Sequence, residues 1–323
     1  MSRAASVSCV LAALLSACQT DDGPSKSDPD VDTGTLDGTS MSRALPVQLV
    51  AEKKLSKLLP TKEVDHYEAS GIVASGGTLY VASDNLTNIA AIDTSLNKGK
   101  LGPGEAINSQ YEAITASDDG RFFAIIEPTT DGDVPAEVDA LASDTAFVDR
   151  SKTDTTFDHA NKGFEGVAWL RVSGSEYLLA LCENNDCKDD DSTPGEGRVK
   201  LLAPVDGVWA TQKTLKLPEL AGFLNYSDIA LRSTGDGSYA VLVVSRKSAM
   251  LWLGTLSTST WAFTGASNFY SFPRDADGAV RYCSVEGVTF LGPQVIAAVS
   301  DKSDGSKPCT DEEESIHIFQ LPQ

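Results

Sequence analysis

The chain has 323 residues, 41% of them hydrophobic, and its 46 acidic and 26 basic residues give a formal net charge of −20. This length and hydrophobic content suffice for a large folded core. A chain this acidic is a poor candidate for binding nucleic acid or anionic lipid, because such binding needs lysine and arginine to neutralise phosphates. The balance of charge instead favours metal ions or cationic partners.

Residues 1–17 have the features of a signal peptide: Arg3 precedes an apolar run that is too short to span a bilayer. The segment ends in Leu-Ser-Ala-Cys, which resembles the lipobox of bacterial lipoproteins and implies cleavage before Cys18 with lipid added to that cysteine. Ordinary signal cleavage near Ala17 is the alternative. We therefore expect an exported protein of the bacterial cell envelope, anchored through lipid on Cys18 to the outer membrane or the outer face of the membrane.

Residues 18–44 follow as a segment of Asp, Ser, Gly, Pro and Thr with almost no apolar residue. Such a composition cannot bury enough surface to offset the entropy lost on ordering, so we expect a flexible tether. The folded domain is predicted to span residues 45–323.

This domain contains five copies of one pattern, in which a polar residue precedes an apolar run, a turn and a second apolar run. The copies are EASGIVASGGTLYVASDN (68–85), EAITASDDGRFFAIIEP (112–128), NKGFEGVAWLRVSGSEYLLALCENND (161–186), SDIALRSTGDGSYAVLVVSRK (227–247) and EGVTFLGPQVIAAVSDK (286–302). The second runs have four to six apolar residues without strict alternation, which is typical of strands buried on both faces. The turns between the runs have hairpin composition.

A third apolar run follows each hairpin, and in the second copy we assign it to TAFVD (145–149). Residues 208–217 and 260–272 fit fourth strands. Four-stranded antiparallel units repeated in this way predict an all-β protein, a five-bladed β-propeller. The last copy lacks a fourth strand, and Val47–Leu55 is predicted to supply it and close the ring. Six blades would result if residues 129–160 hid a degenerate blade.

Polar residues recur at the start of the first strand and at the end of the second strand of every copy. Because these two positions are neighbours in an antiparallel hairpin, we expect them to gather around one mouth of the central channel. The predicted ligand-binding residues are Glu68, Ser70, Glu112, Glu127, Glu183, Asp228, Arg246 and Asp301.

Carboxylates this close raise one another's pKa values unless a cation neutralises them. Calcium suits a loose cage of carboxylate and carbonyl oxygens, so calcium or a small polar ligand is expected at the channel. The alternative is that these residues cap strand ends and bond to loop N–H groups.

The chain resembles the SdiA-regulated, YjiK-like propellers of bacterial envelopes through EASGIV, NKGFEGVAW, YSDIAL and SVEGVTF, over about residues 65 to 305. That family has a D-x-S-G in the fourth position, and here the glycine is replaced at Asp228. A more distant similarity to phytase-like and lactonase-like propellers, which hold calcium in the channel and hydrolyse esters, implies that Glu112, Glu165 and Glu286 are the metal ligands.

Cys182, Cys187, Cys283 and Cys309 remain outside the signal region, and an even number in an exported chain favours two disulfides. Three pairings are open. We expect Cys182 with Cys187 and Cys283 with Cys309, because each pair is close in sequence and lies within one repeat. The spacing matches no usual zinc site.

The nucleophile elbow, the H-E-x-x-H motif and the P-loop are all absent, so the sequence favours a binding protein over an enzyme. We expect this protein to be a monomer. The alternatives are a calcium-dependent hydrolase, in which His66 or His159 would handle the proton, and a scaffold that docks a cationic protein. His317 alternates with isoleucines and is expected to point to solvent.

Overall fold

The computed structural model describes residues 44–60, 65–104, 110–183, 187, 197–218, 223–302, 309 and 312–322. Their regular structure consists of β-strands and one short 3-10 helix, η1 (Leu55–Lys57). Across these ranges no helix has the length and apolar character needed to cross a bilayer.

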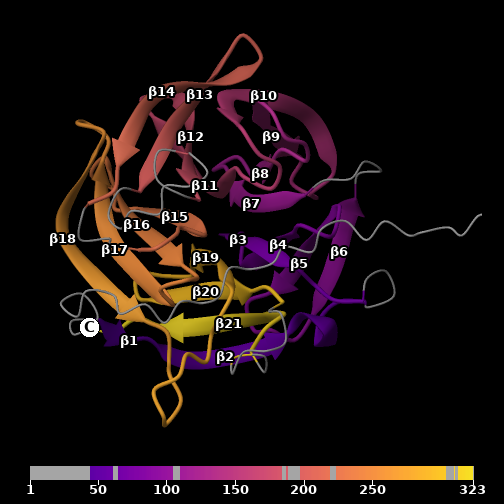
Figure 1. Cartoon of the computed structure of the whole chain (residues 1–323), viewed down its shortest axis with the longest axis vertical. Helices are drawn as coiled ribbons and strands as arrows, with labels where there is room; N and C mark the ends of the chain where they lie inside the picture. Colours follow the sequence, from indigo (N-terminus) through magenta and orange to yellow (C-terminus); the bar gives the residue numbers. More distant parts are fainter. Residues whose placement is uncertain are drawn as a thin grey trace, which may run out of the picture. The chain divides into compact units, whose positions relative to one another are not determined.

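The strands form five four-stranded antiparallel blades, counted over the described residues (Figure 1). The first blade contains β3 (Ala69–Ser75), β4 (Thr78–Ser83), β5 (Asn88–Asp93) and β6 (Gly99–Gly104). The second contains β7 (Tyr111–Ala116), β8 (Phe122–Ile126), β9 (Val134–Leu141) and β10 (Phe147–Phe157). The third contains β11 (Phe164–Val172), β12 (Ser175–Cys182), β13 (Arg198–Val205) and β14 (Val208–Lys216). The fourth contains β15 (Asp228–Ser233), β16 (Ser238–Ser245), β17 (Met250–Ser257) and β18 (Ala262–Ser271).

The fifth blade joins the two ends of the domain. Its strands β19 (Val285–Phe290), β20 (Val295–Ser300) and β21 (Ser315–Gln320) are completed by β2 (Gln48–Lys54), which pairs antiparallel with β21. This pairing confirms the predicted ring closure and the five-bladed propeller. The short strand β1 (Leu45–Pro46) adds in parallel to the outer strand β18.

Residues 129–160 contribute the two outer strands of the second blade, β9 and β10, so they do not form a sixth blade. The assignment of TAFVD as a third strand was wrong: Val134–Leu141 is the third strand, and the end of TAFVD opens the fourth. The signal was weak because Val134–Leu141 (VPAEVDAL) alternates polar with apolar residues and contains a proline. β10 also pairs in parallel with β14 of the next blade.

The buried apolar side chains of the described residues form five clusters, one between each pair of neighbouring blades. Both faces of each sheet are therefore buried, which explains the unbroken apolar runs in the second strands. The same packing corrects the expectation for His317. It is fully buried, because alternate residues of β21 face one neighbouring blade or the other and both faces of this strand are covered.

The inner strands β3, β7, β11, β15 and β19 line the channel in that order, and β19 returns to β3. Side chains bond to the backbone of the next inner strand: the Ser70 hydroxyl donates to the Tyr111 carbonyl, and the Trp169 N–H donates to Thr115 Oγ1 at 2.9 Å. The inner strands approach one another closely at small residues such as Gly166. A Cβ on Gly166 would stand 2.7 Å from the Ile229 nitrogen and 2.8 Å from the Asp228 Cα.

Candidate functional site

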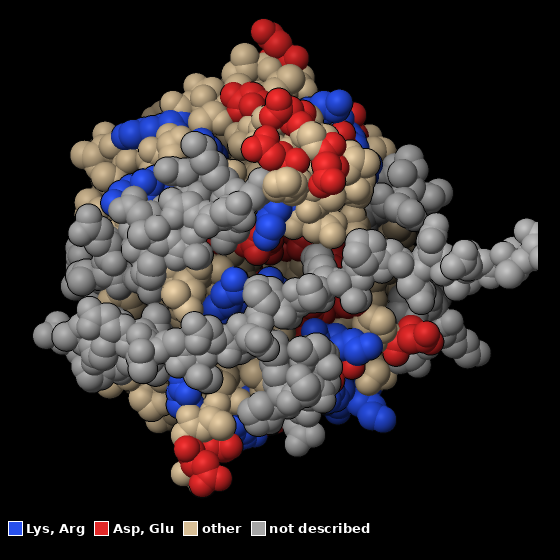
Figure 2. Space-filling model, viewed as in Figure 1, with Lys and Arg blue, Asp and Glu red and all other residues tan. Residues whose placement is uncertain are grey.

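The polar positions of the repeats gather at one end of the blades. Each second strand ends one residue before a charged side chain, and these residues are Asp84, Glu127, Glu183, Arg246 and Asp301. In four blades a register shift opens the facing inner strand, and the residue skipped by the ladder is Ser70, Glu112, Glu165 or Glu286. A bulge of this kind re-aims a side chain. Figure 2 shows acidic side chains in a central hollow, with lysine and arginine side chains at its edge.

Three glutamates of the second and third blades form a compact cluster. Glu112, Glu127 and Glu165 each offer a carboxylate oxygen, and these oxygens all lie within 4.8 Å of one another. Glu112 and Glu127 are buried and Glu165 is partly buried. Gly163 makes room for this arrangement, since a Cβ there would stand 2.9 Å from the Glu127 Cβ.

The pKa of Glu165 is raised well above its ordinary value, chiefly by removal from water and then by the charges of Glu183 and Glu112. The arrangement therefore holds like charges together at a cost that a bound cation would relieve. Carboxylate oxygens are hard donors, and a cluster of three is suited to a cation such as Ca²⁺.

A second group at the same mouth is a chain of ion pairs. Lys162 Nζ lies 2.7 Å from Glu183 Oε2, Arg246 lies 3.8 Å from the other oxygen of Glu183, and Arg246 Nη1 lies 2.6 Å from Glu286 Oε1. Burial lowers the pKa of Lys162, but the charge of Glu183, the hydrogen bond to it and the charge of Glu165 together outweigh burial, so the net pKa is raised. Glu286 thus has a guanidinium partner.

Lys162 was missed by the sequence reasoning. The sequence could have indicated this residue, because Lys162 stands three residues before Glu165 in the NKGFEG motif that begins the third copy. Only the fold shows that this lysine reaches Glu183 at the end of the neighbouring strand of the same blade.

Between the fifth and first blades the acidic residues repel one another. Burial, followed by the charge of Glu286, raises the pKa of Asp301 to about 9, and Asp84 and Glu68 add to the shift. Glu68 Oε1 also lies 2.5 Å from His66 Nε2. The predicted residues Glu68 and Asp301 therefore belong to the same electrostatic group.

Asp228 and Ser70 form hydrogen bonds that join neighbouring blades. Asp228 occupies the position of Gly71, Gly166 and Gly287 in other copies, and its carboxylate accepts the Ile229 N–H at 2.7 Å and the Val288 N–H at 2.8 Å. Burial raises its pKa well above the ordinary value, although these backbone N–H groups oppose the shift. The lost glycine is thus replaced by a buried carboxylate that bridges β15 and β19.

The remaining predicted residues are a histidine and the cysteines. His159 is largely exposed and lies 3.7 Å from Asp131 in the loops beside the second blade. Cys182 pairs with Cys187, directly before Glu183, and Cys283 pairs with Cys309, as predicted. Cys18 lies outside the described residues.

Comparisons with known proteins identify the fold but neither a family nor a function. The chain matches no known protein family and no curated protein sequence. Among solved structures it resembles the glutaminyl cyclase of Myxococcus xanthus, at 10% identity and a TM-score of 0.50, over 87% of this chain and 99% of that one. It also resembles the PQQ-bound aldose sugar dehydrogenase of Streptomyces coelicolor, at 12% identity and a TM-score of 0.42, over 86% and 99% of the two chains.

A third similar structure is the Dos1 propeller, at 8% identity and a TM-score of 0.40, over 87% of this chain and 68% of that one. At such identities the likeness concerns the fold alone, and the substrates of these proteins say nothing about this channel. The strand pairing and the ring closure described above, together with the likeness at a TM-score of 0.50, identify the folded part of this chain as a β-propeller.

Proposed function

We propose that this protein is a lipid-anchored binding protein of the bacterial cell envelope whose propeller holds a divalent cation, Ca²⁺ above others, at Glu112, Glu127 and Glu165. The observation that carries the proposal is the spacing of their carboxylate oxygens, all within 4.8 Å of one another. Oxygens bound to one Ca²⁺ at about 2.3–2.6 Å lie at most about 4.6–5.2 Å apart, so this spacing suits a shared ion without rearrangement.

The proposed ligand set differs from the one implied by the distant resemblance in a single residue. Glu127 replaces Glu286, because Glu286 is engaged by Arg246 at 2.6 Å. Anchoring through Cys18 and membership of the SdiA-regulated, YjiK-like family remain part of the proposal and rest on the sequence motifs alone.

The test is thermal unfolding of the purified chain after EDTA treatment, with and without calcium. Ligand at about 100 times its dissociation constant stabilises by ~2.7 kcal/mol. In a domain of 150–250 residues, 1 kcal/mol shifts the melting temperature by about 2–4 °C, so a rise of several degrees is expected. The calcium-dependent rise, rather than the absolute melting temperature, is compared between variants, because removing like charges also stabilises the apo protein.

The double variant Glu127→Gln, Glu165→Gln should lose the rise, and the matched control Glu137→Gln on the outer strand β9 should keep it. Glu286→Gln distinguishes the ligand set with Glu127 from the set with Glu286. If Glu127 is the ligand, this variant should keep the calcium-dependent rise in melting temperature. No rise with calcium, magnesium or manganese in the unaltered protein would refute a cation site.

One observation favours a second candidate, a calcium-dependent hydrolase: His66 lies 2.5 Å from Glu68 at the same end of the blades. A histidine paired with a carboxylate is suited to accept a proton from water. Turnover of p-nitrophenyl phosphate or a lactone that needs calcium and is lost in His66→Gln would support this candidate. Calcium binding without turnover would favour the binding protein. The absence of both calcium binding and turnover would favour a scaffold for a cationic protein.

A further inference from the structure

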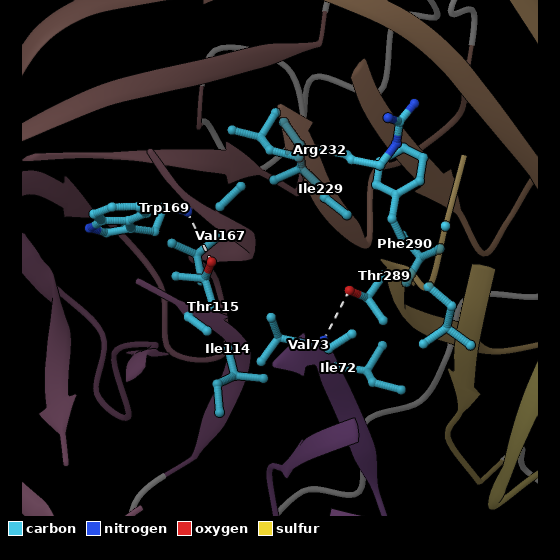
Figure 3. A pocket seen from close by; sticks show the side chains of 18 residues that line it. Ile72, Val73, Ile114, Thr115, Val167, Trp169, Ile229, Arg232, Thr289 and Phe290 are labelled. Carbon is cyan, nitrogen blue, oxygen red and sulfur yellow. Dashed lines mark hydrogen bonds between the residues drawn. The ribbon is translucent and has the colours of Figure 1, made fainter. Parts of the chain in front are cut away.

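The channel has a second chemical environment beyond the acidic mouth. A cavity of about 220 Å³ is lined by all five inner strands, and its polar side chains come from Thr115, Trp169, Arg232 and Thr289 (Figure 3). These residues stand three or four positions further along their strands than Glu112, Glu165, Asp228 and Glu286. At about 3.3 Å per residue, these polar side chains lie roughly 10–13 Å along the strands from the acidic ring, and the nearest lining residues, Ile114, Val167 and Val288, lie two positions from it.

The wall of this cavity is aliphatic, and none of its lining residues is Asp or Glu. Two buried hydroxyls interrupt the apolar wall. Thr115 Oγ1 accepts the Trp169 N–H at 2.9 Å and Thr289 Oγ1 accepts the Ala74 N–H at 3.1 Å. A hydroxyl has a single proton to donate, and neither threonine donates it to another described residue. Both hydroxyls can therefore donate to a ligand.

Arg232 lies at the rim of the cavity. Its guanidinium carbon stands 5.4 Å from the centroid of the Phe290 ring, and Figure 3 shows its side chain along that ring. Its Nε is buried and has no hydrogen-bond partner among the described residues. A buried donor without an acceptor is unfavourable, and an acceptor bound in the cavity would satisfy it.

In this chain of net charge −20, two other arginines near the cavity do pair with carboxylates. Arg121 lies 2.7 Å from Glu176, and Arg171 lies 3.0 Å from Asp118. No carboxylate of the described residues lies within ion-pair distance of Arg232. The guanidinium is thus left for an external anion.

Trp169 supplies a rigid wall. Its Nε1–H donates to Glu176 Oε2 at 2.7 Å, which fixes the plane of the indole ring at one side of the cavity. Figure 3 places Trp169 and Thr115 on one side and Thr289 and Phe290 on the other. The cavity therefore presents an ordered apolar slot with donors at its wall and rim, and ordered contact surfaces bind at a lower entropic cost.

We propose that this cavity is a second binding site, for a small monocarboxylate whose apolar body is about the size of one ring. The polar side chains offer donors for a carboxylate, while the aliphatic wall and Trp169 accommodate the body. An engineered cavity of about 150 Å³ holds benzene, so about 220 Å³ has room for a ring and a carboxylate. The acidic ring repels anions, so the ligand enters from the Arg232 end. This site does not depend on a cation at the other mouth.

The test is titration calorimetry of the purified full chain with benzoate and phenylacetate, beside the neutral analogue benzyl alcohol and the cation benzylamine. Both carboxylates should bind in a saturable manner, at least about tenfold tighter than benzyl alcohol. Benzylamine should bind more weakly still. Arg232→Gln should weaken the carboxylates by about tenfold or more and leave benzyl alcohol unchanged.

The matched control is Arg274→Gln, which removes an exposed arginine that donates to the Gly278 carbonyl and does not line the cavity. It should bind benzoate as the unaltered chain does. If Arg232→Gln fails to fold, Thr289→Val serves instead, with a smaller loss confined to the carboxylates. Equal binding of benzoate and benzyl alcohol, equal binding in Arg232→Gln, or no binding of either carboxylate would overturn the proposal. Loss of calcium binding would leave it untouched.

Discussion

Replacing Gly166 by alanine tests how closely the inner strands approach one another. The added methyl group would meet the Ile229 nitrogen at 2.7 Å and the Asp228 Cα at 2.8 Å, and both are backbone atoms that cannot rotate away. Overpacking of this kind costs about 1–3 kcal/mol. The reduced entropy of the unfolded chain returns about 0.4–1 kcal/mol. We therefore expect a net loss of about 1–2 kcal/mol.

A change of 1 kcal/mol shifts the melting temperature of a domain of 150–250 residues by about 2–4 °C, so Gly166→Ala should melt about 2–8 °C lower by differential scanning calorimetry. Gly292→Ala is the control, because its Cβ would have no heavy atom within 4 Å and its φ is not in the left-handed region. It should match or slightly exceed the unaltered protein. Equal melting temperatures for the two variants would refute the close approach of β11 and β15.

Three further predictions concern titrating groups and a disulfide. Burial lowers the pKa of His317 below 6.5, so the folded state binds fewer protons than the unfolded chain and the free energy of unfolding should fall as pH drops below about 6.5; urea titrations of His317→Gln should lose this dependence. Asp301 has its pKa raised from 3.8 to about 9, so its contribution to stability falls as pH rises through that interval. Asp301→Asn should therefore gain stability over the unaltered protein at pH 7 but not at pH 4, and an equal gain at both would argue against the shift. Removing Cys283–Cys309, a crosslink across 26 residues, by serine substitution should cost about 3.5 kcal/mol in chain-entropy terms, measured by urea unfolding.

The blade pattern could be predicted from the sequence because every copy has the same order of apolar runs and turns. Apolar runs separated by hairpin turns predicted the two inner strands of every blade, and the unpartnered segment before the first copy predicted the ring closure by β2. Outer strands were harder to predict, since they are partly solvated and their apolar pattern is diluted. Val134–Leu141 was missed for this reason.

At the site, the sequence could predict which end of each strand a charge occupies but not which charges meet. The clustering of Glu112, Glu127 and Glu165 depends on the bulges and on the space beside Gly163. The engagement of Glu286 by Arg246 depends on the reach of a side chain between blades. His317 was placed wrongly because alternation predicts two faces but not what covers them. In this blade the Ser300 hydroxyl lies 3.0 Å from its Nε2 and the Glu52 carboxylate 3.4 Å from its Nδ1.

The closing pair of strands also has a consequence for how the chain folds. Gln48 is paired with Gln320, so nearly the whole domain separates two residues of one blade. Non-local pairing of this kind slows folding, because the chain entropy is lost before the contact is gained. Since synthesis proceeds from the N-terminus, β2 is made first and must wait for β21, the last strand, before its ladder exists. During that interval β2 carries unpaired backbone groups, and a chain that stops short of residue 315 would leave β2 without a partner.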